Sequence, residues 1–128
     1  MEYSSNKLSK MSGVSARTLR HYDEIDLLKP IRIASSGYRI YGQAEVDKLQ
    51  QILFYRELGL KLKEIKIILS APDFDKKQTL LNHLIKLHEK REHLYKLMQN
   101  VSRSLAAMNG EIDITDYEKF DGFKLVGR

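Results

Sequence analysis

Apolar residues recur at helical spacing along most of this chain, and the runs are separated by Gly, Pro or hydroxyl residues. The first run is short. Ser4 is a suitable N-cap, Leu8 and Met11 lie three residues apart, and Gly13 can take the positive φ that ends a helix. The pattern therefore predicts a first helix between Ser4 and Gly13 with one apolar face.

A second helix is predicted to begin after Ser15. Val14 and Leu19 occupy the two positions of a hydrophobic staple around this N-cap. On a helical wheel, Leu19, Tyr22 and Ile25 share one side. Two helices joined by a very short glycine-containing turn are typical of a helix-turn-helix.

An extended segment follows Pro30, which cannot continue the second helix. Residues 31–34 and 38–41 are β-prone and flank a turn at residues 35–37 that contains glycine. The pattern predicts a β-hairpin beside the helix pair.

Two further amphipathic helices are predicted, one between Gly42 and Gly59 and one between Gly59 and Pro72. Gly42 is a tolerated N-cap. The inward positions are Val46, Leu49, Ile52 and Leu53 in the first helix, and Leu62, Ile65 and Leu69 in the second.

The segment after Pro72 has a different pattern. Asp75 and Gln78 resemble a capping box, and apolar residues then recur at alternating steps of four and three. A helix carrying this seam would be about 50 Å long, and one narrow stripe needs a partner, most simply a second copy. The seam positions are Leu80, Leu84, Leu87, Arg91, Leu94, Met98, Val101, Leu105 and Met108.

Arg91 is the one charged residue in the seam. A lone charge at such a position costs stability and can fix register and orientation. The alternative is that its long side chain extends past the seam into solvent.

These patterns divide the chain into three segments. Residues 1–71 form the predicted DNA-binding domain, residues 75–108 the predicted dimerisation helix, and residues 109–128 an acidic, aromatic tail. The tail is too short to fold alone. The expected fold is mainly α: a winged helix-turn-helix followed by one long helix.

The charge distribution adds a functional clue. The net charge is +5, and residues 109–128 contain five acids and three bases, so residues 1–108 carry about +7. A basic body suits a nucleic acid or an anionic membrane. The chain has no cysteine, which excludes disulfides, thiolate metal sites and a thiol switch. There is no apolar segment of membrane-spanning length and no signal-peptide pattern, so a cytoplasmic location is expected.

Basic and hydroxyl side chains on the second helix point to DNA binding. Arg17 and His21 lie opposite Leu19 on the wheel, with Thr18 and Arg20 beside them. Arginine pairs with guanine edges, while hydroxyl and imidazole groups suit phosphate oxygens. The alternative is an ordinary solvated helix face with Tyr22 partly in the core.

The hairpin and the fourth helix supply further candidates. Arg39 is the better phosphate ligand of the hairpin, because one of its tyrosines is expected to anchor it. Lys61 stands where the N-terminus of the fourth helix could meet a phosphate. The full predicted DNA-binding set is Ser15, Arg17, Thr18, Arg20, His21, Tyr22, Tyr38, Arg39, Tyr41 and Lys61.

Metal binding and catalysis find no support in the sequence. His83, His88 and His93 are five residues apart, and such steps spread them around a helix rather than placing them on one face. We interpret them as surface residues. No nucleophile–base pair, paired carboxylates or glycine-rich phosphate loop is present, so no enzyme activity and no cofactor are expected.

The order of these motifs resembles the MerR family of transcriptional regulators. The matching stretches are GVSARTLRHYDEIDLLKP, SGYRIY, LQQILFYRELGLKLKEIKIIL and the heptad helix, which together cover residues 3–108. HYD in the second helix and DFD before the long helix place it nearest the multidrug-responsive branch that includes TipA and Mta. The tail sequence TDYEKFDGFK resembles the opening of the TipA-type drug-binding domain.

The resemblance implies an antiparallel coiled-coil homodimer that binds a pseudo-palindromic promoter. It further implies that the dimer bends and untwists an overlong −35 to −10 spacer, so that RNA polymerase engages both elements. A small-molecule effector is possible, although its site is not evident. The chain is either a fragment of a longer regulator or a short form, and the ending KLVGR is either added sequence or a divergent tail.

Three features depart from the family pattern. Asp26 stands where the family usually has Gly, and Asp tolerates left-handed geometry at some cost. Lys61 replaces the usual hydroxyl cap, and the cysteines of the metal-sensing branch are absent. Two other functions remain open: a coiled-coil interaction module and an architectural, excisionase-like DNA binder.

Overall fold

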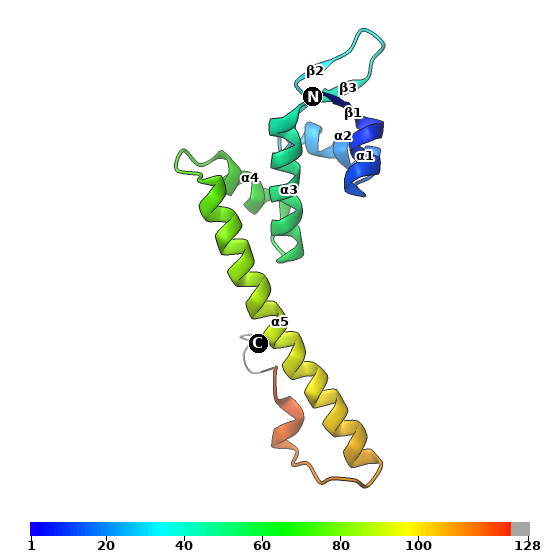
Figure 1. The fold of residues 1–128 in the computed structure, drawn as a ribbon, viewed down its shortest axis with the longest axis vertical. Helices are drawn as coiled ribbons and strands as arrows, with labels where there is room; N and C mark the ends of the chain where they lie inside the picture. Colours follow the sequence, from blue (N-terminus) through cyan, green and yellow to red (C-terminus); the bar gives the residue numbers. More distant parts are fainter. Residues whose placement is uncertain (124–128) are drawn as a thin grey trace. The chain divides into compact units, whose positions relative to one another are not determined.

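The computed structural model describes residues 1–123 and confirms the mainly helical fold (Figure 1). The ending at residues 124–128 lies outside the described part. Two compact units are present, residues 1–80 and residues 81 onward. The elements in chain order are β1 (Tyr3–Ser4), α1 (Ser5–Ser12), α2 (Ala16–Glu24), β2 (Arg32–Ile33), β3 (Arg39–Tyr41), α3 (Gln43–Glu57), α4 (Leu62–Ser70), α5 (Lys76–Met108) and the 3₁₀ turn η1 (Tyr117–Phe120).

The predicted ends of α1 are confirmed. The Lys7 amide donates to the Ser4 hydroxyl at 3.2 Å, and Gly13, with φ of 76°, donates to the Ser9 carbonyl at 2.9 Å. Tyr3 and Ser4 also form a strand, which the sequence pattern does not predict. Because an N-cap has extended backbone angles, the residue that starts α1 can also extend a sheet.

The three strands form a small antiparallel sheet in the order β1-β3-β2. Tyr3 faces Tyr41 across β1 and β3, and Ile33 faces Arg39 across β2 and β3. The predicted hairpin is present with shorter strands than expected. Its turn contains Gly37, whose φ is 90° and whose amide donates to the Ala34 carbonyl at 2.8 Å. We call this hairpin, residues 31–41, the wing.

One apolar core joins the first four helices and the wing. Its buried members come from α1, α2, α3 and α4, from β3, and from the segment that follows α2. They are Leu8, Leu19, Tyr22, Leu27, Leu28, Tyr41, Leu49, Ile52 and Ile65. This shared core holds α2 and the wing on the same rigid body.

The departure from the family pattern at Asp26 has a clear geometry. Asp26 has φ of 58°, the left-handed conformation that the sequence analysis considered for it. It follows α2, where the chain reverses toward the buried Leu27 and Leu28. The Leu27 and Leu28 amides both donate to the Tyr22 carbonyl, at 2.9 and 3.1 Å.

The long helix α5 extends without a break over 33 residues. Asp75 caps its start as predicted, because the Gln78 amide donates to the Asp75 carboxylate at 3.1 Å. Its end is also as predicted, with Gly110 at φ of 75°. No helix in the described residues is both long and apolar enough to cross a membrane.

Most of the heptad seam on α5 is exposed in the single chain. From Leu84 to Met108 the exposed fraction of the apolar seam residues lies between 36% at Leu87 and 83% at Met108, and Arg91 is also exposed. Leu80, at the start of the seam, is half-buried. Large apolar side chains at regular spacing thus remain in contact with solvent in the described residues.

The interpretation of the α5 histidines needs one correction. His83 is buried, with 3% of its surface exposed, and burial lowers the pKa of its imidazole. His88 is exposed and His93 is half-buried. The prediction that all three lie on the surface is therefore wrong for His83, because a position outside the seam gives no periodic signal of burial. Among residues 1–123, no cluster of three metal-ligating side chains occurs.

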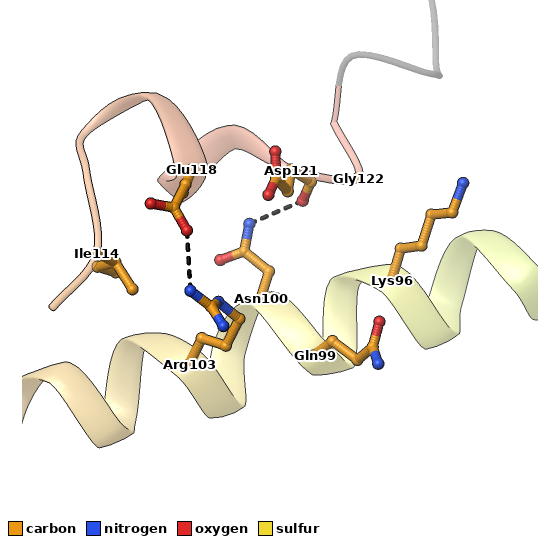
Figure 2. Close-up of a pocket in the computed structure, with 8 residues that line it drawn as sticks. All are labelled: Lys96, Gln99, Asn100, Arg103, Ile114, Glu118, Asp121 and Gly122. Carbon is orange, nitrogen blue, oxygen red and sulfur yellow. Dashed lines mark hydrogen bonds and ion pairs between the residues drawn. The ribbon is translucent and has the colours of Figure 1, made fainter. Parts of the chain in front are cut away.

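In the second unit, the tail folds back along α5. The Asn100 side-chain amide donates to the Lys119 carbonyl at 2.9 Å and to the Asp121 carbonyl at 2.7 Å. Arg103 pairs with Glu118 at 2.8 Å (Figure 2). We call these three contacts the clasp. In the heptad pattern, Asn100 and Arg103 are not seam positions, so the clasp uses a different face of α5 from the seam.

We predict that Asn100→Ala will release the tail. The substitution removes two hydrogen bonds, each worth about 1 kcal/mol. Amide hydrogen exchange at Asp121 and Phe123, which donate to carbonyls within the tail turn, should accelerate roughly tenfold or more.

Gln99→Ala is the matched control, since Gln99 lies beside Asn100 and makes no bond of the clasp. Its exchange rates in the tail should remain close to those of the wild type. Equal protection of the tail in the Asn100 variant would show that the two Asn100 bonds do not hold it.

Candidate nucleic-acid interface

The start of α2 is fixed by Ser15. Its hydroxyl oxygen accepts a hydrogen bond from the Thr18 amide at 3.0 Å, and its hydroxyl proton is donated to the Thr18 side-chain oxygen at 2.9 Å. The predicted N-cap is confirmed. Ser15 is exposed and Thr18 half-buried, so both hydroxyls stand at the accessible N-terminal end of the helix.

The rotation of α2 about its axis is fixed by the core. Leu19 and Tyr22 are 0% and 1% exposed. Since they occupy one side of the helix, Arg17, Arg20 and His21 emerge on the other and are exposed. The structure thus places these three sequence-predicted residues together on one accessible surface.

The same surface borders a hollow of about 520 Å³. Arg56, from the last turn of α3, contributes to it and donates a hydrogen bond to the Tyr22 hydroxyl at 3.2 Å. The residues that line the hollow are Arg17, Thr18, Arg20, His21, Tyr22, Glu24, Arg56 and Leu62.

Arg56 was not identified from the sequence. Helical periodicity places Arg56 outside the apolar face of its helix, but periodicity gives no information on which neighbouring helix the side chain approaches. With Arg17 and Arg20, it makes three guanidinium groups against the single carboxylate of Glu24 around the hollow. The surplus of positive charge suits an anionic partner.

Two of the predicted contact residues follow the alternative that the sequence left open, a place in the core. Tyr22 and Tyr41 both belong to the core, with 1% and 0% of their surface exposed. Both side chains pack in the core and support α2 and β3 from behind, and Tyr22 also lines the hollow, where its hydroxyl accepts the hydrogen bond from Arg56. The burial of Tyr41 could not be predicted, because strand alternation shows which residues share a face but not which face is buried.

The remaining wing residues divide as the alternation predicts. Tyr38 is 62% exposed, whereas Arg39 is half-buried and its Nε donates to Asp23 Oδ2 at 2.9 Å. Lys29 Nζ donates to Asp23 Oδ1, also at 2.9 Å. These hydrogen bonds from Lys29 and Arg39 hold the pKa of the Asp23 carboxyl below its usual value.

Lys61 is the exposed N-cap of α4, as predicted from the sequence. Its backbone amide donates to the Glu64 carboxylate at 3.1 Å. Glu64 thus satisfies one of the amides that the sequence analysis expected to be available for a phosphate. The Lys61 side chain is an exposed cationic group at the start of α4, as is that of Lys63.

A separate cavity of about 390 Å³ lies in the second unit between the tail and α5 (Figure 2). Its volume is in the range of small-molecule sites. The residues lining it are Lys96, Gln99, Asn100, Arg103, Ile114, Glu118, Asp121 and Gly122. Asn100, Arg103 and Glu118 are also members of the clasp, so the cavity is a product of the folded-back tail.

Comparison with known proteins agrees with this arrangement. Residues 3–72 match the MerR HTH family of regulatory proteins, and residues 46–109 match the family region described as "MerR, DNA binding". Over 125 residues, the chain is 38% identical to the HTH-type transcriptional activator mta of Bacillus subtilis, covering 98% of this chain and 49% of mta.

Two further proteins extend the comparison. The chain is 39% identical over 123 residues to the activator TipA of Streptomyces coelicolor, covering 96% of this chain and 49% of TipA. The crystal structure of the regulator SkgA from Caulobacter crescentus superposes with a TM-score of 0.85 at 38% identity, covering 96% of this chain and 88% of that one.

The chain spans about half the length of the curated relatives mta and TipA. The matched family regions contain α2, the wing and all of α5, which are the elements that carry the basic surface and the seam. The chain belongs to the MerR family of helix-turn-helix regulatory proteins.

Proposed function

We propose that this chain binds promoter DNA as a homodimer and regulates transcription. The observation that carries the proposal is the exposed cationic surface of α2, which shares one rigid core with the wing. A helix of this kind fits the major groove, while a hairpin beside it contacts the adjacent backbone.

Each exposed side chain has a role in this proposal. Arg17 and Arg20 are the candidates for guanine edges, because a guanidinium forms two parallel hydrogen bonds with guanine O6 and N7. His21 and Tyr38 suit phosphate oxygens. The set of proposed contacts is Ser15, Arg17, Thr18, Arg20, His21, Tyr38, Arg39 and Lys61, to which the structure adds Arg56.

We predict that Arg17→Ala will weaken binding to the target promoter roughly tenfold to a hundredfold, the effect of losing one base or phosphate contact. The measurement is footprinting on the promoter upstream of the protein's own gene over a series of salt concentrations. For the wild type, log K should fall steeply with log salt, because phosphate contacts release counterions.

Lys86→Ala is the matched control. It also removes one positive charge, but from an exposed position on α5. Its affinity should remain near that of the wild type. A wild-type affinity insensitive to salt, or equal losses in both variants, would contradict the proposed interface.

The exposed seam supports the dimer. Leu94, Met98, Val101 and Leu105 are between 49% and 66% exposed at heptad positions. Contiguous apolar surface of this kind marks an interaction site, and a helix with one such stripe buries it efficiently against a second copy. We propose an antiparallel pairing of two α5 helices, as the resemblance implies.

We predict opposite effects for two substitutions in the seam. Leu94→Asp should convert the dimer to monomers and abolish specific DNA binding, because it introduces a charge into the interface.

Arg91→Leu should raise the melting temperature of the dimer, because the seam then becomes continuous. Sedimentation analysis and thermal denaturation measure the two outcomes.

Circular dichroism provides the folding control for these variants, since the core of the first unit contains neither residue. Full DNA affinity in Leu94→Asp would show that α5 serves another purpose. A clear loss of stability in Arg91→Leu would contradict the proposed location of Arg91 in the seam.

We further propose that the dimer activates transcription by distorting a promoter whose spacer is too long. The support is the family membership together with the names of mta and TipA, which describe both as activators. Two α2 helices and two wings would contact one duplex at four places. Deformation of the DNA between these contacts would change the relative position of the −35 and −10 elements.

This part of the proposal predicts a dependence on spacer length. Transcription by RNA polymerase in vitro should require the protein on the natural promoter and become independent of it when the spacer is shortened to ordinary length. The deletion should lie between the protein's site and one promoter element, so that the spacing of the two half-sites is unchanged and the protein still binds. Activation that persists unchanged on the shortened promoter would contradict spacer distortion.

A further inference from the structure

Asp23 connects three separate pieces of the DNA-binding unit. It belongs to the last turn of α2 and has only 16% of its side chain exposed. Its two carboxylate oxygens accept hydrogen bonds from Lys29, in the segment after α2, and from Arg39 on β3, each at 2.9 Å. Asp23 is therefore the direct polar link between α2 and the wing.

The two bonds differ in what they constrain. Lys29 is 59% exposed and also bonds to the Asp26 carboxylate and the Asp23 carbonyl, at 3.0 and 3.1 Å. A rotatable ammonium on a flexible stem loses little orientation if one acceptor is removed. Arg39 has a side chain that is 29% exposed, and Asp23 is the only hydrogen-bond partner of its guanidinium among residues 1–123.

The bond to Arg39 uses the Nε atom. A guanidinium is planar, so fixing Nε restricts the plane that contains the other four N–H groups. These terminal N–H groups have no partner in the described residues. A negative charge at the C-terminal end of a helix is unfavourable by itself, and Lys29 and Arg39 offset that cost. The lowered pKa of Asp23 is consistent with a carboxylate that stays ionised between two cations.

We propose that Asp23 is a positioning residue for DNA recognition, which acts by holding the Arg39 guanidinium in a fixed plane for a backbone phosphate. Asp23 itself does not contact DNA. This inference rests on the proposed DNA-binding function and adds a source of specificity to it. Because the Asp23 carboxylate links α2 to Arg39, the wing contacts the DNA backbone in the right geometry only where α2 is bound in the correct position.

Removing Asp23 has two opposed physical effects. Loss of a negative charge near a polyanion raises the affinity for any duplex. Release of Arg39 lowers the affinity for the correct site, where its orientation matters, and has little effect on non-specific binding. A comparison between the target promoter and a scrambled duplex of equal length separates the two.

The experiment is a double-mutant cycle with the full chain, using Asp23→Asn, Arg39→Gln and the double variant. Asp23→Asn should bind the target promoter about tenfold more weakly and the scrambled duplex at least as tightly as the wild type. In the Arg39→Gln background, the Asp23 substitution should cause no further loss on the target. Lys29→Gln is the control for the second partner of Asp23, and it should leave the ratio of the affinities for the target and scrambled duplexes close to that of the wild type.

Three results would overturn the inference. They are full additivity between Asp23 and Arg39, an equal rise of affinity for both duplexes in Asp23→Asn, and wild-type affinity in Arg39→Lys. The last variant keeps the charge but lacks the planar group, and it decides the question if Asp23→Asn does not fold. Failure of the wild type to prefer its promoter over the scrambled duplex would instead refute the proposed function.

Discussion

The burial of Leu19 and Tyr22 is the constraint on which the proposed DNA surface depends. These two residues, three positions apart, fix the rotation of α2, and that rotation decides which side chains reach solvent. A helix turned by one residue would bring Arg20 toward the core and expose Leu19. The basic surface is therefore a consequence of apolar packing, and the charges themselves contribute little to holding it in place.

The same core sets the relation of the wing to α2. Tyr41 anchors β3 from behind, and its neighbour Arg39 reaches the Asp23 carboxylate on α2. The two links are different in kind. Burial of Tyr41 is non-directional and fixes the position of the strand, whereas the bond between Arg39 and Asp23 is directional and fixes the orientation of one functional group.

Much of this arrangement could be predicted from the sequence. The cap at Ser15, the left-handed residue Gly13 and the uninterrupted helix α5 follow from local rules of capping and periodicity, and the structure confirms them. The left-handed geometry at Asp26 is suggested by the family resemblance. The rest depends on contacts between segments far apart in the chain. Neither the location of Arg56 beside α2 nor the bonds from Asn100 to the tail leaves a periodic signal in the sequence.

The clasp has a consequence for how this part of the chain tolerates changes of length. The seam and the clasp are both defined by positions on α5, with Met98 and Val101 in the seam and Asn100 and Arg103 in the clasp. One residue inserted into the helix before position 98 would rotate everything beyond it by about 100° relative to the preceding turns. The later seam positions would then no longer continue the earlier stripe, and the tail would move to a new side. An insertion in the non-helical link at residues 111–116 would only lengthen that link and would leave the rotation of α5 unchanged. Natural variation in length is therefore expected in the link and not in the helix.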